Sequence, residues 1–243
     1  RYRIRNLADN KIIGETDGFR ALKECHEGAV YLHTAKSWLV KRLDLEGRDI
    51  QVTPFKGAYF TRALSDKTTH ILETYTSRNV GATRVCFGRV RVTETISGYQ
   101  KLLIGSRKII GRYPLDLPPQ IFETEGLWLE IPETLRQRIE NRRLHFMGGI
   151  HAMEHAMIAL IPLLVLCDRN DIGGISHPWH EELEKAAIFI YDGYSGGVGL
   201  TRKAFSQIDL LLEKTLAAVR ECPCELGCPS CVHSPKCGSG NRP

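Results

Sequence analysis

Short runs of alternating hydrophobic and polar residues follow one another through roughly the first 130 residues of the chain. The runs are rich in β-branched and aromatic residues and are separated by Gly, Asp and Asn, which is typical of strands joined by turns. The expected strands cover residues 30–33, 38–43, 51–53, 59–62, 70–75, 84–95 and 99–104. The pattern predicts a β-rich N-terminal half, built as a meander or a small barrel.

The pattern changes after Pro132, where longer stretches with helical spacing begin. The expected elements are a charged helix over 133–143, an apolar helix over 150–167, a buried strand over 187–191 and an amphipathic helix over 200–220. The sequence thus predicts an α+β fold whose C-terminal half is mixed α/β. We expect three parts: a β-rich subdomain over 1–132, a mixed α/β subdomain over 133–220 and a cysteine-rich tail over 221–243.

The composition is that of an ordinary globular protein. Of the 243 residues, 42% are hydrophobic and 25% are charged, so the chain can bury a sizeable core. The formal net charge of +5 is compatible with a nucleic-acid partner, although many enzymes have the same balance. The most apolar stretch, 156–167, is interrupted by Pro162 and is too short to span a membrane, so we expect no membrane association. The chain begins at Arg1 without a methionine, which is typical of a segment of a longer polypeptide.

Five of the eight cysteines lie in the last 22 residues, interspersed with proline and glycine. Two closely spaced thiol pairs in such a segment are typical of a zinc knuckle with a tetrahedral thiolate site. A pair of disulfides is the alternative, but Cys25, Cys86 and Cys167 stand singly in apolar contexts, which favours a reducing compartment. The predicted Zn²⁺ ligands are Cys222, Cys224, Cys228 and Cys231, with Cys237 either replacing Cys222 or remaining a thiol outside the site.

A second group of metal-ligand residue types has the form H-x-x-E-H, with His151, Glu154 and His155. On a helix the two histidines are one turn apart on the same face, so they can share a metal ion while Glu154 activates a bound water. Such a hydrolase needs a third ligand, and the sequence does not single one out. Three interpretations stay open: a structural hydrogen-bond network, a second metal site, and catalysis by Glu154.

The glycine-rich segment 192–199 stands between the predicted strand and the last helix. It is not a Walker A loop, because Leu200 occupies the place of the phosphate-binding lysine. We interpret it as a tight turn that lets the strand and helix pack closely, with backbone contact to a nucleic-acid phosphate as the alternative.

Basic residues concentrate in two stretches, and aromatic residues such as Tyr99 and Tyr113 lie among them. This combination can follow a phosphate backbone, although charge runs of this length are also common on solvated surfaces. The nucleic-acid-binding candidates are Lys101, Arg107, Lys108, Arg112, Arg142 and Arg143.

Five stretches of the chain carry a family resemblance: GAVYLHTAKSWLVKRLDLEGRDIQV, KGAYFTRAL, GGIHAMEHAMIALIPLLVLCDRNDIGG, IFIYDGYSGGVGL and CPCELGCPSCVHSPKCGSGN. Together they resemble the C-terminal accessory domain of YprA- or MrfA-type superfamily 2 DEAD/DEAH-box DNA helicases, a family associated with DNA repair. The resemblance covers roughly residues 28 to 241, and the cysteine tail is its most specific part.

The resemblance implies an accessory module downstream of two motor lobes, with a structural zinc ion at its end. ATP and Mg²⁺ would bind only in the parent motor, because this chain has no Walker A, Asp-Glu-x-His or arginine-finger motif, and we expect no enzyme activity from the chain alone. The implied partners are single-stranded or forked DNA and the motor lobes of the same polypeptide, in the cytoplasm at the nucleoid. Two alternatives stay open: a zinc-dependent hydrolase that uses His151, Glu154 and His155, and a protein-interaction platform.

Overall fold

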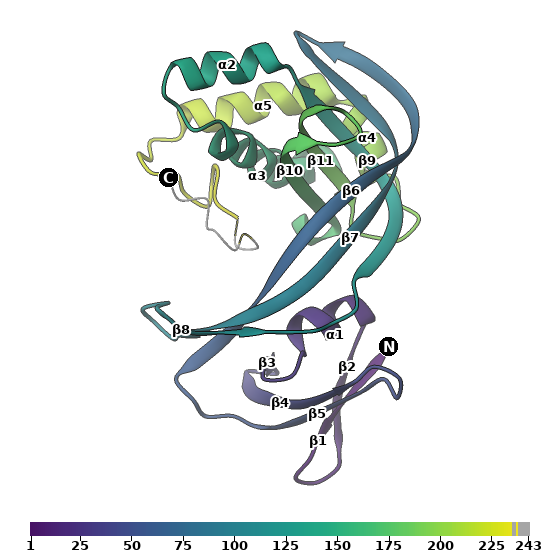
Figure 1. Cartoon of the computed structure of the whole chain (residues 1–243), viewed down its shortest axis with the longest axis vertical. Helices are drawn as coiled ribbons and strands as arrows, with labels where there is room; N and C mark the ends of the chain where they lie inside the picture. Colours follow the sequence, from purple (N-terminus) through teal and green to yellow (C-terminus); the bar gives the residue numbers. More distant parts are fainter. Residues whose placement is uncertain (235–236, 238–243) are drawn as a thin grey trace. The chain divides into compact units, whose positions relative to one another are not determined.

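The computed structural model describes residues 1–234 and residue 237. The chain forms two compact units: the first contains residues 1–66 and 94–120, and the second contains residues 67–93 and those from 121 onward. Two long strands, β6 (Tyr59–Val80) and β7 (Thr83–Leu103), contribute residues to both units (Figure 1). Each unit is described by itself below.

A five-stranded sheet forms the centre of the first unit, with the strand order β2-β1-β5-β4-β3. Neighbouring strands are antiparallel except for β1 and β5, which pair in parallel. The short helix α1 (Gly18–Glu24) buries Ala21 among sheet residues such as Ile4, Val40 and Ile50. The strands are β1 (Tyr2–Asn6), β2 (Ile12–Thr16), β3 (Val30–His33), β4 (Lys36–Asp44) and β5 (Asp49–Pro54).

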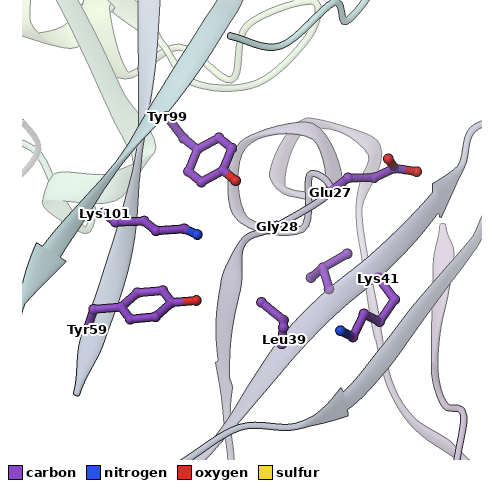
Figure 2. A pocket seen from close by; sticks show the side chains of 8 residues that line it. Glu27, Gly28, Leu39, Lys41, Tyr59, Tyr99 and Lys101 are labelled. Carbon is purple, nitrogen blue, oxygen red and sulfur yellow. The ribbon is translucent and has the colours of Figure 1, made fainter. Parts of the chain in front are cut away.

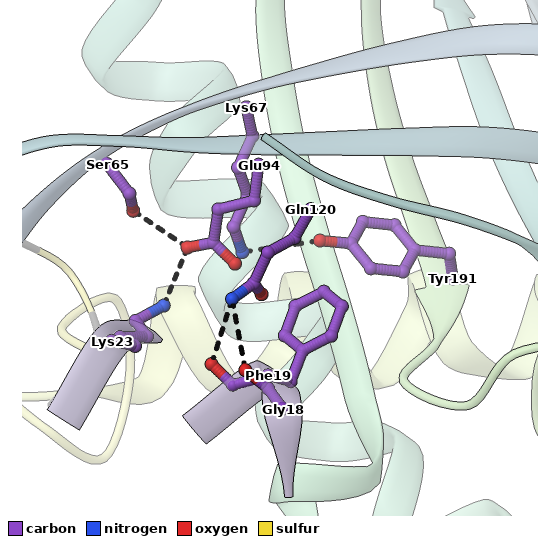
Figure 3. Close-up of polar contacts among 8 residues, drawn as sticks. All are labelled: Gly18, Phe19, Lys23, Ser65, Lys67, Glu94, Gln120 and Tyr191. Atoms are coloured by element: carbon purple, nitrogen blue, oxygen red, sulfur yellow. Dashed lines mark hydrogen bonds and ion pairs between the residues drawn. The ribbon is translucent and has the colours of Figure 1, made fainter. Parts of the chain in front are cut away.

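Polar side chains hold α1 against strand residues of the same unit (Figure 3). The buried Glu94 carboxylate accepts a hydrogen bond from Lys23 Nζ at 2.7 Å and another from Ser65 Oγ at 2.8 Å. The Gln120 amide nitrogen donates to the backbone carbonyl of Phe19 at 3.2 Å. Because a buried carboxylate without partners is costly, the bonds from Lys23 and Ser65 are what make Glu94 tolerable in this interior.

The sheet of the second unit has the strand order β10-β11-β9-β7-β6. Its strands β9 (Gln120–Ile131), β10 (Ile172–His180) and β11 (Lys185–Asp192) pair in antiparallel fashion. Every residue of β11 after Lys185 is buried, so this strand lies at the centre of the core. The near-continuous apolar run that predicted a buried strand over 187–191 reflects this position.

The two strands at the ends of this order, β6 and β10, contact each other through side chains. His177 Nε2 lies 2.9 Å from Thr69 Oγ1, and His180 Nε2 lies 3.0 Å from the Thr69 carbonyl oxygen. The carboxylate of Glu182 accepts from the Ile71 amide at 3.1 Å. These bonds bring the ends of the sheet together, and the sheet is therefore barrel-like. Nearby in the same unit, Lys67 Nζ donates to the Tyr191 hydroxyl at 3.3 Å (Figure 3).

Helices cover one side of the second unit's sheet (Figure 1). The longest helix, α3 (Phe146–Leu164), packs against β10, β11 and α5. Its residues Ile150, Met157 and Ile161 are buried with β11 residues in the largest apolar cluster. The other helices are α2 (Glu133–Asn141), α4 (Leu200–Ser206), α5 (Ile208–Glu221) and the 3₁₀ turn η1 (Arg169–Asp171).

By length and composition alone, α3 could cross a membrane, since its mean hydropathy over 18 residues is 1.3. The central helix of a globular core has the same composition. The packing of α3 against two strands and α5 supports that second interpretation.

The structure confirms the α+β class, contains elements that were not among the expected ones (among them β1, β2, α1, β9 and β10), and joins or divides expected elements in two places. Four expected strands are two continuous strands, β6 with 22 residues and β7 with 21, and the expected last helix is divided at Gln207 into α4 and α5. The expected division into three parts at residues 132 and 220 stays a prediction. Each long strand belongs to one unit at one end and to the other unit at the other end, which no local pattern reveals.

The glycine-rich segment connects β11 to α4 as a turn organised by one carboxylate. Asp192 is fully buried, and its two oxygens accept the backbone N–H groups of four consecutive residues at 2.7–3.1 Å. Gly197 has φ +74°, and a Cβ there would come within 2.8 Å of the Glu125 side chain. An internal anion therefore already occupies the helix N-terminus, which supports the turn interpretation against phosphate binding. The four donors are Val198, Gly199, Leu200 and Thr201.

We predict that Asp192→Ala lowers the free energy of unfolding by about 2–4 kcal/mol, because it leaves four N–H groups, including the buried one of Thr201, without this acceptor. Chemical denaturation of the full chain measures this change. As a matched control, Asp168→Ala removes an exposed carboxylate that caps only the η1 turn, through the Asn170 amide at 2.7 Å, and costs about 1 kcal/mol. Equal losses in the two variants would show that Asp192 does not organise the turn.

Candidate metal centre

Four cysteine side chains converge immediately after α5 ends. Cys222 Sγ lies 3.3 Å from Cys224 Sγ and 3.5 Å from Cys228 Sγ, and Cys231 Sγ lies 3.4 Å from Cys224 Sγ and 3.6 Å from Cys228 Sγ. All four sulfurs lie within 4.8 Å of one another. The two predicted pairs thus form one cluster, and Cys231 is its most buried member.

The sulfur positions fit a tetrahedral zinc ion. With Zn–S bonds of about 2.3 Å, tetrahedral ligands are about 3.8 Å apart, close to the observed separations. The observed Sγ–Sγ separations are much longer than the S–S bond of about 2.05 Å in a disulfide. None of the eight cysteines, all of which are described, is in a disulfide. The Cys228 amide also donates to Cys231 Sγ at 3.2 Å, which stabilises a thiolate ligand.

The thiols influence one another's ionisation. A hydrogen bond from the Ser230 backbone, together with one involving Cys222, lowers the pKa of Cys228 to about 7. Hydrogen bonds with Cys222 and Cys231 raise the pKa of Cys224 to about 12. Hydrogen bonds from neighbouring thiols can stabilise one thiolate. Four thiolates at one site repel one another unless a cation lies between them.

The three scattered cysteines lie outside this cluster. Burial raises the pKa of Cys25 to about 12 and that of Cys86 to about 11, so these thiols stay protonated in the core. Cys167 is half-buried, and burial also raises its pKa. Cys25 and Cys86 are thus small buried residues as expected, whereas Cys167 is partly exposed.

The H-x-x-E-H residues lie on α3, near residue 237. The imidazole rings of His151 and His155 have centroids 4.2 Å apart, and His151 Nε2 lies 3.2 Å from Cys237 Sγ. The pKa of His151 is raised to about 9, chiefly by a hydrogen bond with Glu154, whereas burial lowers the pKa of His155. Cys237 therefore contacts α3. The sequence carried no signal for this contact, because residues 151 and 237 are 86 positions apart.

Glu154 is not positioned as an open catalytic base. Its side chain is 6% exposed, and Oε2 lies 3.2 Å from His151 Nδ1. A carboxylate in this position fixes the orientation and tautomer of the imidazole.

The basic candidates belong to different units. Arg142 and Arg143 are exposed residues at the end of α2 in the second unit. In the first unit, Arg107 and Lys108 are exposed beside the turn between β7 and β8 (Ile109–Pro114), and Arg112 is exposed on β8. Lys101 is a lining residue of a pocket in the first unit.

This pocket has a volume of about 400 Å³ and lies in the first unit (Figure 2). Lys101 Nζ is 5.1 Å from the centroid of the Tyr59 ring and 4.4 Å from that of Tyr113, and the rings of Tyr113 and Tyr99 are stacked at 5.0 Å. Gly28 has φ +81°, and a Cβ there would lie 2.3 Å from the Tyr99 hydroxyl, so only glycine permits this approach. The lining residues are Glu27, Gly28, Leu39, Val40, Lys41, Tyr59, Tyr99 and Lys101.

We predict that Cys228→Ser removes one equivalent of bound zinc and unfolds the tail, because the Pro- and Gly-rich loop has little apolar surface to bury without the ion. Metal analysis and hydrogen exchange of the full chain measure the two effects, and exchange in the first unit should stay unchanged. Cys167→Ser is the matched control and should keep its zinc. Unchanged zinc content in Cys228→Ser would contradict the assignment.

Comparison with known proteins relates this part of the chain to a zinc-binding family. The family model of the MrfA Zn-binding domain matches residues 153–232, which include the four clustered cysteines. The ATP-dependent helicase YprA of Bacillus subtilis is 30% identical over 229 residues, covering 93% of this chain and 30% of its own length. An uncharacterised protein of Methanocaldococcus jannaschii is 41% identical over 96 residues, covering 38% of this chain and 86% of its own length.

A solved structure extends the similarity to the fold. The crystal structure of the DUF1998 helicase MrfA bound to DNA is 28% identical, with a TM-score of 0.64, and covers 98% of this chain and 32% of its own. This chain thus spans about a third or less of the helicases that it matches. The cluster and the family model together show a zinc-binding domain with structural Zn²⁺. The chain is therefore homologous to part of the YprA/MrfA-type helicases, and its residues 153–232 match the MrfA Zn-binding domain family.

Proposed function

We propose that this chain is the C-terminal zinc-binding accessory domain of an ATP-dependent DNA repair helicase, which contacts DNA and supports the motor lobes. The observation that carries the proposal is the match of 98% of the chain to a helicase structure with DNA bound. The chain corresponds to 30% of YprA, and we assign ATP and Mg²⁺ binding to motor lobes in the remaining part of such a protein. The helicase acts in the cytoplasm, at the nucleoid.

The zinc ion has a structural role in this proposal. We assign Cys222, Cys224, Cys228 and Cys231 as its ligands. Four thiolates complete a tetrahedron and leave no position for a substrate or a reactive water. The ion would hold the segment after α5 in a defined conformation, which the loop's own sequence cannot maintain.

We place a DNA contact at the pocket of the first unit. The Lys101 ammonium lies close to the rings of both Tyr59 and Tyr113, and Tyr113 is 40% exposed. Aromatic faces stack on bases of any sequence, and a nearby ammonium can pair with a phosphate. A single strand, or the single-stranded part of a fork, offers unstacked bases for this contact, whereas a duplex does not. Arg107, Lys108 and Arg112 would add charge along the same hairpin.

The hydrolase alternative has less support because Glu154 is buried against His151 Nδ1 rather than directed at an open metal position. The protein-interaction alternative stays a prediction. Salt dependence separates it from DNA binding, since each phosphate contact releases counterions and weakens the complex as salt rises.

We predict that Tyr59→Ala weakens binding of the full chain to a single-stranded oligonucleotide by about 1–3 kcal/mol, the usual worth of one stacked base, whereas Tyr59→Phe retains binding. Fluorescence anisotropy measures the affinity. Equal affinities of Tyr59→Ala and the unaltered chain would exclude stacking at this pocket.

We also predict that Lys101→Ala reduces the slope of log affinity against log salt by about 0.7, which corresponds to one phosphate contact on a single strand. Lys11→Ala, in the turn between β1 and β2, removes the same charge outside the pocket and serves as the control. If the two lysine variants change the slope equally, the pocket is not the DNA contact.

A further inference from the structure

A second group of metal-ligand atoms lies outside the four-cysteine cluster, where α3 contacts residue 237. One ligand atom from each of His151, His155 and Cys237 lies within 4.8 Å of the others. In a tetrahedral zinc site with Zn–N bonds of about 2.0 Å and Zn–S bonds of about 2.3 Å, ligand atoms are about 3.5 Å apart. The distance of 3.2 Å between His151 Nε2 and Cys237 Sγ is close to this value.

The other nitrogen of each imidazole is held by a hydrogen-bond partner. His155 Nδ1 lies 2.8 Å from the Val232 carbonyl oxygen, to which it can only donate a proton. His151 Nδ1 lies 3.2 Å from Glu154 Oε2 and 3.1 Å from Ser176 Oγ. Protonation at Nδ1 leaves the lone pair on Nε2 of both rings. Metal-ligating histidines are characteristically held in this way, by a carbonyl or a carboxylate on the nitrogen that does not bind the ion.

The burial of these side chains distinguishes the group from a chance cluster of polar residues on the surface. His155 is 5% exposed, Glu154 is 4% exposed, and His151 is half-buried. A hydrogen bond between His151 and Cys237 would explain the positions of these two side chains only. It would not account for a second buried imidazole, oriented by the Val232 carbonyl, beside the same thiol.

The donor set selects the kind of ion. Two imidazole nitrogens and one thiolate suit zinc, whereas Mg²⁺ and Ca²⁺ prefer oxygen ligands. We propose that His151 Nε2, His155 Nε2 and Cys237 Sγ bind a second zinc ion, separate from the ion of the four-cysteine cluster. Three protein ligands leave the fourth position for water or an exogenous ligand. Cys237 is thus a ligand of this second ion and not a substitute for Cys222.

The second ion would fasten the chain beyond Cys231 to α3. The first cluster follows directly from the end of α5, so its ion holds the start of the tail. Val232 and Cys237 both contact histidines of α3, so the second ion would hold the part that follows. The two sites together would connect α5, the cysteine loop and α3.

Zinc content and cobalt substitution of the full chain test the proposal. The unaltered chain, purified without chelator and equilibrated with zinc, should hold two equivalents, and Cys237→Ser should hold one. Cys167→Ser, a matched control outside both groups, should keep two. In the Co²⁺ form, Cys237→Ser should lose the charge-transfer absorption of one thiolate, because only thiolate ligands contribute to that band.

His155→Asn is the sharper variant, since the asparagine amide can still donate to the Val232 carbonyl but has no Nε2. It should also lose one equivalent while its thermal melting shows a cooperatively folded chain. A single equivalent in the unaltered chain would overturn the proposal. Two equivalents in folded Cys237→Ser or His155→Asn would overturn it as well.

Discussion

The burial of α3 is the interaction on which the rest of the second unit depends. This helix packs against β10 and β11 on one side and against α5 on another, and it supplies Ile150, Met157 and Ile161 to the largest apolar cluster. Burial of large aliphatic side chains contributes about 1.5–3 kcal/mol each, far more than any exposed ion pair of the unit. Once the buried face of α3 is packed against its neighbours, the positions of the remaining α3 side chains follow from helical geometry.

The packing of α3 connects the core to the metal chemistry. His151 and His155 are one helical turn apart, so the same packing that buries Ile150 and Met157 also places both imidazoles beside the tail. The helix α5 packs against α3 and ends at Glu221, and the four-cysteine cluster begins directly after this end. Of residues 222–234 only Cys231 is buried, so we assign the stability of this segment to metal ligation rather than to hydrophobic burial.

The main feature of the first unit is a pocket lined by aromatic and basic residues. Its pocket depends on the absence of a side chain at Gly28, which allows Tyr99 to approach, and on the stacking of Tyr99 with Tyr113 across the β7–β8 hairpin. The Lys101 ammonium lies over the resulting aromatic surface. Aromatic and cationic groups in one pocket can contact a nucleic-acid strand without reading its sequence, as the proposed DNA contact requires.

Local information in the sequence determined much of this protein. The α+β class, the buried strand β11, the start of α2 and the clustering of Cys222, Cys224, Cys228 and Cys231 all follow from patterns within a few residues, because strand alternation, helix periodicity and metal-ligand spacing are short-range properties. The family resemblance was recognisable for the same reason, since it lies in contiguous stretches.

Tertiary structure alone decided the features that join distant residues. It placed Cys237 beside His151, brought Thr69 to His177 and His180 to close the sheet, and made β6 and β7 continuous strands shared by two units. Only the tertiary structure shows that the buried Asp192 carboxylate accepts the backbone N–H groups at the end of the glycine-rich turn. A contact between residues 86 or 108 positions apart leaves no periodicity in the chain, because it depends on how whole elements pack and not on the residues between them.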